Sequence, residues 1–164
     1  MKKIIVILFC LVCLVGCATG GNHSSKNVEK VQGGTPIGNM GVIIDSSYDE
    51  SINREFPGYK VLSVAILNAS YNIIPMDPSH DTWSVRIDNK VYKTVHDLRQ
   101  SNPELWNSFS ESKRNLLSYP LALPIGASFV IDLFVTEDVP LEKYTDLIVY
   151  LSGLNKKVEI LPRQ

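Results

Sequence analysis

The sequence predicts an all-β domain, a β-sandwich of about seven strands with a short helical insertion. Several segments alternate apolar and polar residues with a period of two, as half-buried strands do. Turn-forming Pro, Gly, Asn and Asp residues separate these segments. The strands do not alternate with helices, so the pattern does not indicate a parallel α/β sheet.

The clearest strand is YKVLSVAILN, residues 59–68. The segment 82–95 predicts a β-hairpin, because Asp88-Asn89 tolerates positive φ between two alternating runs. Three more strands follow in the last third of the chain. The residues expected to face the core are Leu62, Val64 and Ile66; Trp83, Val85 and Ile87; Phe129, Ile131, Leu133 and Val135; Leu147, Val149 and Leu151; and Val158 and Ile160.

Residues 97–119 interrupt this pattern and predict a short helix inserted between strands. The helix begins either with a capping box from Ser101 to Glu104 or with Asn102 as the cap before Pro103. Its expected apolar face consists of Leu105, Trp106, Phe109 and Leu116.

The same insertion is the expected partner-binding surface. A connection longer than about 12 to 15 residues is usually functional or disordered, and this one carries helix-start chemistry. Trp106 and Phe109 either dock the helix on the sandwich or, if exposed, anchor a partner. Basic side chains on a faintly acidic body suit the rim of an interface. The candidate partner-binding residues are Arg99, Trp106, Phe109, Lys113 and Arg114.

The N-terminus predicts a signal peptide, residues 1–16. Lys2 and Lys3 precede an apolar run from Ile4 to Val15. As a helix this run would span about 18 Å, well short of the roughly 30 Å hydrocarbon core of a bilayer.

The end of the apolar run, Leu14-Val15-Gly16-Cys17, resembles the lipobox of bacterial lipoproteins. The resemblance implies cleavage between Gly16 and Cys17 and a lipid on Cys17; Ala18, where an aspartate commonly retains lipoproteins in the inner membrane, resembles the outer-membrane default. An ordinary secretory cleavage site is the alternative. A metal site is disfavoured because the three cysteines lie in an apolar segment without a fourth ligand. All three lie at or before position 17, so the domain cannot form a disulfide.

Residues 17–36 predict a lipid-anchored, flexible tether, and residues 37–164 predict the sandwich domain. The tether is rich in Gly, Ser, Asn and Lys and has few large apolar residues. As a coil it would reach on the order of 25 Å.

A second resemblance concerns the domain itself. Asp88-Asn89-Lys90-Val91-Tyr92 and the later Leu123-Pro124-Ile125-Gly126 resemble the hairpin and turn of a broad family of bacterial lipoprotein domains of unknown function. That family has a telokin-like, immunoglobulin-like fold. The chain departs from the family pattern at Asn89, where glycine is usual, and at Ile125, which separates Pro124 from Gly126. The resemblance covers roughly residues 57–161; it implies the fold and no catalytic residue.

Composition and motifs argue against nucleic-acid binding and against catalysis. With 16 basic and 17 acidic residues and a formal net charge of -1, the chain has no electrostatic footprint for nucleic acid. The consecutive residues Ser79-His80-Asp81 cannot converge as a catalytic triad, and no other catalytic or cofactor motif occurs, so we expect no enzyme and no cofactor. Asp77, His80 and Asp81 are a weak candidate cation site, and a self-capped turn is the alternative.

These observations together predict a lipid-anchored, non-enzymatic lipoprotein of the bacterial envelope. Its sandwich domain would bind another envelope protein or support an envelope assembly, most simply at the outer membrane facing the periplasm. A ligand- or ion-binding periplasmic module is one alternative, and a hydrolase is another, because sandwiches host grafted sites.

Overall fold

The computed structural model describes residues 28–163. The predicted signal peptide, the predicted cleavage site between Gly16 and Cys17, and the first part of the predicted tether lie outside the described residues. The elements in chain order are β1 (Glu29–Gln32), η1 (Gly38–Met40), β2 (Val42–Tyr48), η2 (Glu50–Glu55), β3 (Tyr59–Asn68), β4 (Ile74–Pro75), β5 (Thr82–Ile87), β6 (Lys90–Lys93), α1 (Leu98–Ser101), α2 (Pro103–Ser108), α3 (Glu111–Leu117), β7 (Ala122–Leu123), β8 (Ser128–Thr136), η3 (Leu141–Lys143), β9 (Asp146–Leu151), η4 (Ser152–Leu154) and β10 (Lys156–Leu161).

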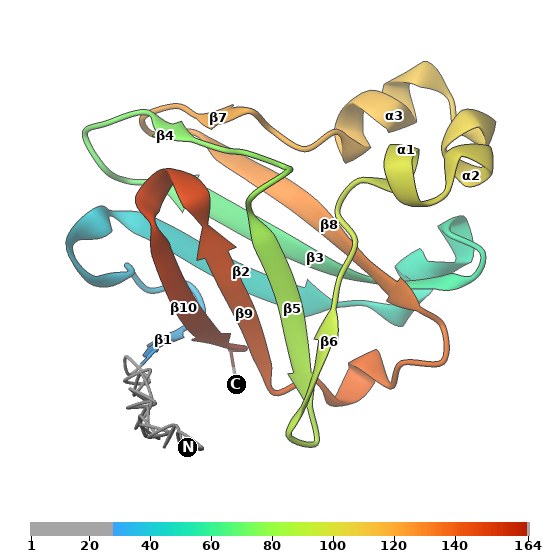
Figure 1. Ribbon diagram of the computed structural model, residues 1–164, viewed down its shortest axis with the longest axis horizontal. Helices are drawn as coiled ribbons and strands as arrows, with labels where there is room; N and C mark the ends of the chain where they lie inside the picture. The colour runs from blue at the N-terminus through green and yellow to red at the C-terminus, as the bar shows by residue number, and fades with distance from the viewer. Residues whose placement is uncertain (1–27, 164) are drawn as a thin grey trace, which may run out of the picture.

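The described chain is mostly β, with a few short helices (Figure 1). One sheet has five strands in the order β1-β10-β9-β5-β6, and a second has three in the order β2-β3-β8. The short strands β4 and β7 form a separate pair. Neighbouring strands are antiparallel except β1 and β10, which are parallel. Within residues 28–163, no helix is long and apolar enough to cross a membrane.

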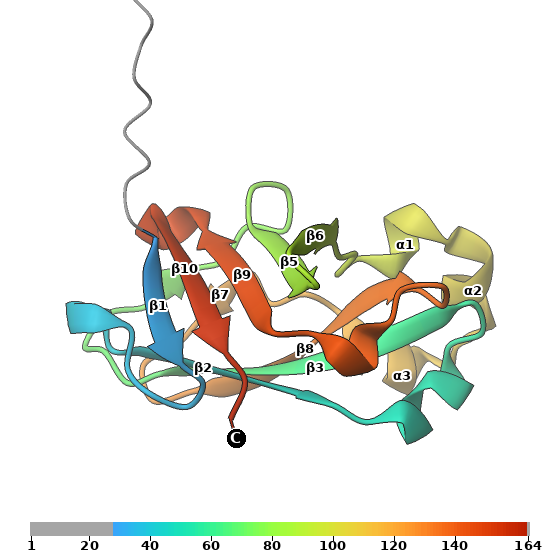
Figure 2. The same ribbon diagram turned by 90° about the horizontal axis from the view of Figure 1, so that it is seen from below.

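The two larger sheets lie as two layers, one over the other (Figure 2). A single core cluster takes buried side chains from both sheets, among them Val64 and Leu133 from one and Trp83 and Val149 from the other. At one edge the layers are joined directly: the backbone of Val95, just after β6, exchanges two hydrogen bonds of 2.8 and 2.7 Å with Phe134 of β8.

Alternation predicted most of the core-facing residues correctly. The expected inward residues of β3, β5, β9 and β10 are all buried. The Asp88-Asn89 turn is also confirmed, because both residues have positive φ, 47° and 65°, as a two-residue hairpin turn requires.

Strand β8 departs from the expected pattern at both ends. Phe129 is 38% exposed, although it was expected in the core, because it lies at the start of β8, where Ser128 and Val130 are exposed as well; Ile131, Leu133 and Val135 on the same face are buried. Phe134 was not expected to be buried but is 1% exposed. It faces the opposite side of the sheet, where the helical insertion covers it.

The structure also moves the N-terminal boundary of the domain. Glu29–Gln32, assigned to the tether, form β1, which pairs with β10 along its whole length. Lys30 forms an ion pair of 3.0 Å with Glu159, and Val31 packs against the main core. The part of the tether within the described residues is therefore integrated into the sheet, and the folded domain begins about eight residues earlier than expected.

Candidate functional site

The helical insertion consists of three short helices, and each begins at a capping side chain. Asp97 accepts a hydrogen bond from the Arg99 backbone N–H (2.9 Å). Asn102 accepts one from the Leu105 N–H (3.1 Å), and Pro103 follows it at the start of α2. Of the two predicted helix starts, the Asn102-Pro103 alternative is therefore confirmed, and Ser101 instead ends α1.

The two aromatic residues of the insertion dock it on the three-stranded sheet. Trp106 and Phe109 are partly buried and pack against a second core cluster, separate from the main one. The Phe109 ring meets Phe56 edge to face at a centroid distance of 5.6 Å, and Phe56 meets Phe134 at 5.0 Å. Such pairs favour this T-shaped geometry. The docking alternative for the two aromatics is therefore the one that the structure favours.

Of the three basic residues expected to bind a partner, Lys113 also packs against the domain. Its ammonium lies 2.9 Å from Glu55 and 4.4 and 4.5 Å from the ring centroids of Phe56 and Phe109. Arg114 is half-buried, whereas the Arg99 side chain is 68% exposed, with only a 3.4 Å contact to Asp97. Leu116, expected on the docking face, is 80% exposed, and the neighbouring Leu117 packs inward instead.

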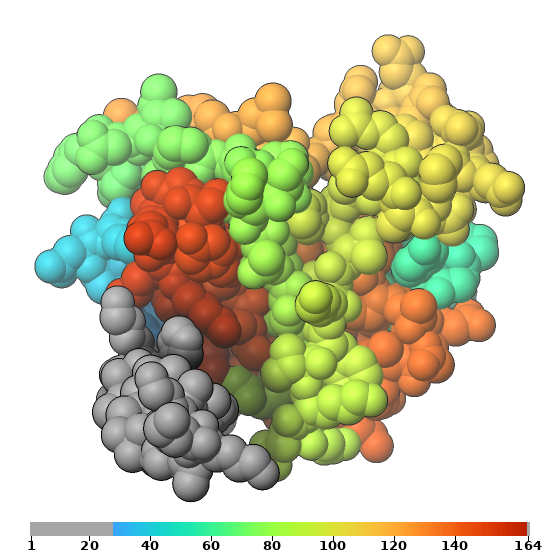
Figure 3. Space-filling view, in the orientation of Figure 1, coloured from blue at the N-terminus to red at the C-terminus, as the bar shows by residue number. Residues whose placement is uncertain are grey.

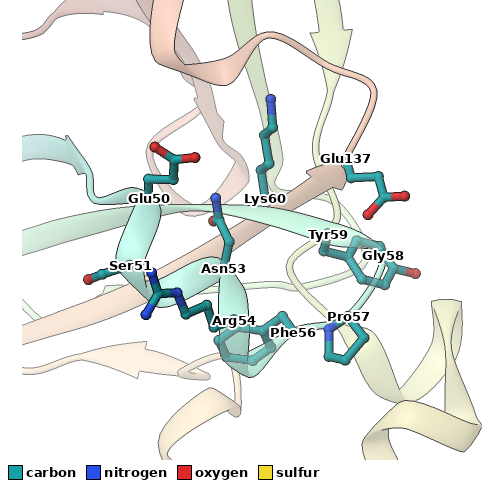
Figure 4. A pocket seen from close by; sticks show the side chains of 10 residues that line it. All are labelled: Glu50, Ser51, Asn53, Arg54, Phe56, Pro57, Gly58, Tyr59, Lys60 and Glu137. Carbon is teal, nitrogen blue, oxygen red and sulfur yellow. The ribbon is translucent and has the colours of Figure 1, made fainter.

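A cleft of about 650 Å³ opens beside the docked insertion (Figure 4). It lies between η2, the first residues of β3 and the end of β8, and it shares Phe56 with the second core cluster. The lining residues are Glu50, Ser51, Asn53, Arg54, Phe56, Pro57, Gly58, Tyr59, Lys60 and Glu137.

Hydrogen bonds hold the side chains of Asn53 and Lys60 in place in the wall of the cleft. Asn53 accepts a hydrogen bond from the Val61 N–H and donates one to the Tyr48 hydroxyl, both at 2.9 Å. Lys60 donates to the Val139 carbonyl (2.8 Å) and pairs with Glu142 (3.2 Å). The Glu142 backbone N–H and the Lys60 ammonium together hold the pKa of Glu142 below its usual range.

The rim of the cleft carries both signs of charge. Glu50, Arg54 and Glu137 are exposed, around a lining that includes Phe56, Pro57 and Tyr59. At the start of η2, hydrogen bonds from Ser51 lower the pKa of Asp49 below its usual range. A concave surface with an aromatic lining and a mixed-charge rim can hold a polypeptide segment. Sequence reasoning missed this cleft; the polar run of residues 49–55 before Pro57-Gly58 is a local signal of an exposed loop, but it does not define a concave shape.

The candidate cation site does not form. His80 lies 2.7 Å from Asp77, and this contact, together with the Ser79 N–H, lowers the pKa of Asp77. Asp81 turns the other way, into the protein, where it is only 3% exposed. In residues 28–163 no group of three or more His, Cys, Asp and Glu side chains is arranged to hold a metal. The alternative, a turn in which Asp77 caps the nearby backbone, is the one observed, because the Ser79 N–H donates to the Asp77 carboxylate at 2.8 Å.

Asp81 is the acceptor of a buried hydrogen-bond network that the sequence did not indicate. Ser152 donates to it twice, from its N–H and its hydroxyl, both at 2.7 Å. The Tyr119 hydroxyl donates at 2.8 Å and the Asp77 N–H at 2.9 Å. Trp83 Nε1 in turn donates to Tyr119 at 3.1 Å. The network ties the end of the insertion to β5 and η4.

The histidines with neighbouring carboxylates have structural contacts. His96 Nε2 lies 3.0 Å from the Pro78 carbonyl, and its ring packs on Tyr119 at 4.6 Å. The adjacent Asp97 caps α1. Ser79, His80 and Asp81 diverge, as consecutive residues do.

Family models, curated proteins and solved structures give no significant match to this chain. Its function is therefore inferred from its own residues and geometry.

Proposed function

We propose that this chain is a lipid-anchored, non-enzymatic lipoprotein of the bacterial envelope. Its domain, in this proposal an immunoglobulin-like β-sandwich, binds another envelope protein at the end where the helical insertion and the cleft meet. The lipobox-like Leu14-Val15-Gly16-Cys17 supports the anchor, and Ala18 supports the outer membrane, facing the periplasm.

The observation that carries the binding role is the cleft of about 650 Å³ beside the docked insertion. The insertion presses Phe109 and Lys113 onto Phe56 and Glu55, so it fixes one wall next to the cleft. In this proposal Trp106, Phe109 and Lys113, which were expected to contact the partner, instead support the binding surface from within. Exposed groups such as Arg54, Glu137 and Arg99 contact the partner.

The anchor is tested by replacing Cys17 with Ser in cells fed labelled palmitate. The variant should lose the label, whereas Cys10→Ser and Cys13→Ser, which lie inside the signal peptide, should keep it. Unchanged labelling of Cys17→Ser would refute the lipidation.

The binding surface is tested with a photo-crosslinking residue placed at Arg54 or Glu137 and, as a control, at Thr82 on the five-stranded sheet. All three positions are exposed. We expect a discrete crosslinked protein from the two cleft positions and none from Thr82, with the crosslink weakened by Glu50→Ala. Equal crosslinking from all three positions would contradict a binding role for the cleft.

The same cleft supports a second candidate, a small-ligand module, because its volume lies in the range of about 300–1,000 Å³ that is common for ligand pockets. A ligand-dependent rise in melting temperature that Arg54→Ala abolishes would favour this alternative.

A further inference from the structure

One end of the domain is formed mainly by loops without charged residues. The strand registers place three connections at this end: residues 33–41 before β2, residues 69–73 after β3, and residues 124–127 before β8. Pro75 lies against Gly153 of η4, which brings residues 152–154 to the same end. None of these four segments contains Asp, Glu, Lys or Arg. We call them the uncharged end. The loop of residues 76–81 adjoins it, because Ser152 donates hydrogen bonds to Asp81, and this loop carries Asp77 and Asp81.

The opposite end of the domain is rich in charged residues. Residues 49–58 carry Asp49, Glu50, Arg54 and Glu55, and residues 137–145 carry Glu137, Asp138, Glu142 and Lys143. The helical insertion also lies on that side of the molecule (Figures 1 and 3). The domain is therefore polarised along its strands.

Large apolar side chains project from the uncharged end. Tyr71 is 93% exposed, Ile73 63% and Ile125 56%. Tyr71 and Ile73 border a hollow of about 440 Å³, which Met40 and Leu154 also line. Exposed apolar groups that gather in one place mark an interaction site more often than single ones do.

These loops are held by a buried polar residue. The Asn68 side chain is fully buried and donates to the carbonyls of Asn72 (2.7 Å) and Leu123 (2.9 Å). It also accepts hydrogen bonds from the N–H and the hydroxyl of Ser70 (2.9 and 2.6 Å). Its backbone pairs with Gly126 and Ala127. The apolar tips are thus presented from tied loops.

The chain enters the domain next to the uncharged end. The Glu29 carboxylate lies close to Gly38, in the η1 turn whose Asn39 and Met40 line the hollow. Glu29 also pairs with Lys156 at 2.9 Å, two residues after Leu154. Only eleven residues, 18–28, separate Cys17 from Glu29. Eleven residues span at most about 40 Å and, in a flexible chain, about 18 Å.

We infer that the uncharged end rests on the surface of the bilayer that holds the lipid anchor, with Tyr71, Ile73 and Ile125 in the headgroup region. The inference rests on the proposed lipidation of Cys17. A short link between the anchor and Glu29 keeps this end nearest the membrane. Exposed tyrosine and aliphatic side chains suit the interface, where tyrosine is enriched. The nearby carboxylates of Glu29 and Asp77 are each paired, with Lys156 and His80 respectively. The charged end, with the cleft and the insertion, then faces away from the membrane.

The test uses the full lipidated protein in vesicles of phosphatidylethanolamine and phosphatidylglycerol. An Ile73→Cys variant carries a fluorescent label, since acylated Cys17 offers no free thiol. The matched control is Leu116→Cys, another exposed apolar position but on the insertion. Lipids with a spin label near the headgroup should quench the label at position 73 at least threefold more than the label at position 116.

The possible outcomes separate the two proposals. Failure of the protein to float with the vesicles overturns both the anchor and the orientation. Flotation with equal quenching at the two positions overturns the orientation alone. If position 73 is shielded from thiol reagents in native membranes but is not quenched in vesicles, a protein covers this end and the inference is wrong.

Discussion

Asp81 accepts four hydrogen bonds at a position that is 3% exposed. Its partners are backbone N–H groups and hydroxyls rather than a counter-ion. We expect Asp81→Ala to lower the free energy of unfolding by about 3 kcal/mol, because it leaves buried donors unpaired. Urea unfolding followed by tryptophan fluorescence measures this loss, since Trp83 belongs to the same network.

The matched control is Asp138→Ala, at an exposed position in a turn. Its free energy of unfolding should stay within about 0.5 kcal/mol of the unmodified protein. An Asp81→Ala variant as stable as this control would show that the network does not contribute to the fold.

The ionisation of Tyr119 makes the free energy of unfolding depend on pH in the alkaline range. Burial, reinforced by the charge and hydrogen bond of Asp81, raises the pKa of Tyr119 well above its ordinary value of 10.0. The unfolded chain then loses the phenolic proton before the folded one does, so this contribution is complete below about pH 10 and is lost as the pH rises further. Tyr119→Phe should flatten the decline in unfolding free energy above about pH 10.

Some decline should remain in Tyr119→Phe, because burial also raises the pKa of Tyr144. Tyr71→Phe, at a solvent-exposed position, is the control and should leave the pH profile unchanged. A Tyr119→Phe profile that superimposes on that of the unmodified protein would contradict this account.

Single residues were predictable from sequence where their role is local. The Asp88-Asn89 turn and the Asn102 cap depend on neighbours in the chain, and both are confirmed. Asp81 was not predictable, because Tyr119 lies 38 residues away and Ser152 lies 71 residues away. In the sequence, Asp81 follows Ser79 and His80, and this pattern suggested a cation site at the surface.

At the scale of elements, the insertion is bound to the sheet by buried side chains. Leu98 of α1 is 1% exposed and belongs to the same cluster as Phe56 and Phe134. We expect Leu98→Ala to cost about 2–5 kcal/mol of unfolding free energy, through lost burial and the cavity left behind. Chemical denaturation measures this cost.

Leu116→Ala is the matched control, because it removes the same atoms from a side chain that is 80% exposed. It should be nearly neutral. Equal effects of the two substitutions would mean that α1 does not dock as described. Exchange of residues 101–117 for a flexible linker removes Trp106 and Phe109, which pack against the same cluster, so it should unfold or strongly destabilise the domain rather than merely remove a binding surface.

The strand faces were predictable because a period of two is a local signal. The insertion was predicted as one helix, and the structure has three, since Asn102 and Ser110 each begin a new helix. β1 was missed because its four residues include three polar ones, and its partner strand lies about 130 residues away. Only the pairing itself identifies such a strand.

The whole domain is held together without covalent crosslinks. No cysteine occurs after position 17, so the two core clusters and the sheet pairings must supply the stability. The melting temperature should be the same with and without a reductant, as calorimetry can check. A shift of several degrees on reduction would require a crosslink through the N-terminal cysteines.

The all-β class was predictable at this scale, and the layout was not. Alternation shows that strands exist, but it does not state which strands are neighbours. The second core cluster arises because the insertion covers the far side of β3 and β8 around Val61 and Phe134. The cleft follows from that arrangement, so no local motif could have shown it.

The parallel pairing of β1 with β10 has a consequence for how the chain folds. These strands come from the two ends of the domain, and β10 is the last of the described strands to be synthesised, so the β9 edge of the sheet stays unpaired until β10 has emerged. An unpaired edge is a template for pairing between molecules. Contacts of such long sequence separation also form slowly. Newly made molecules are therefore most prone to associate with one another in the interval before β10 pairs with β9 and Glu29–Gln32 add the short outer strand.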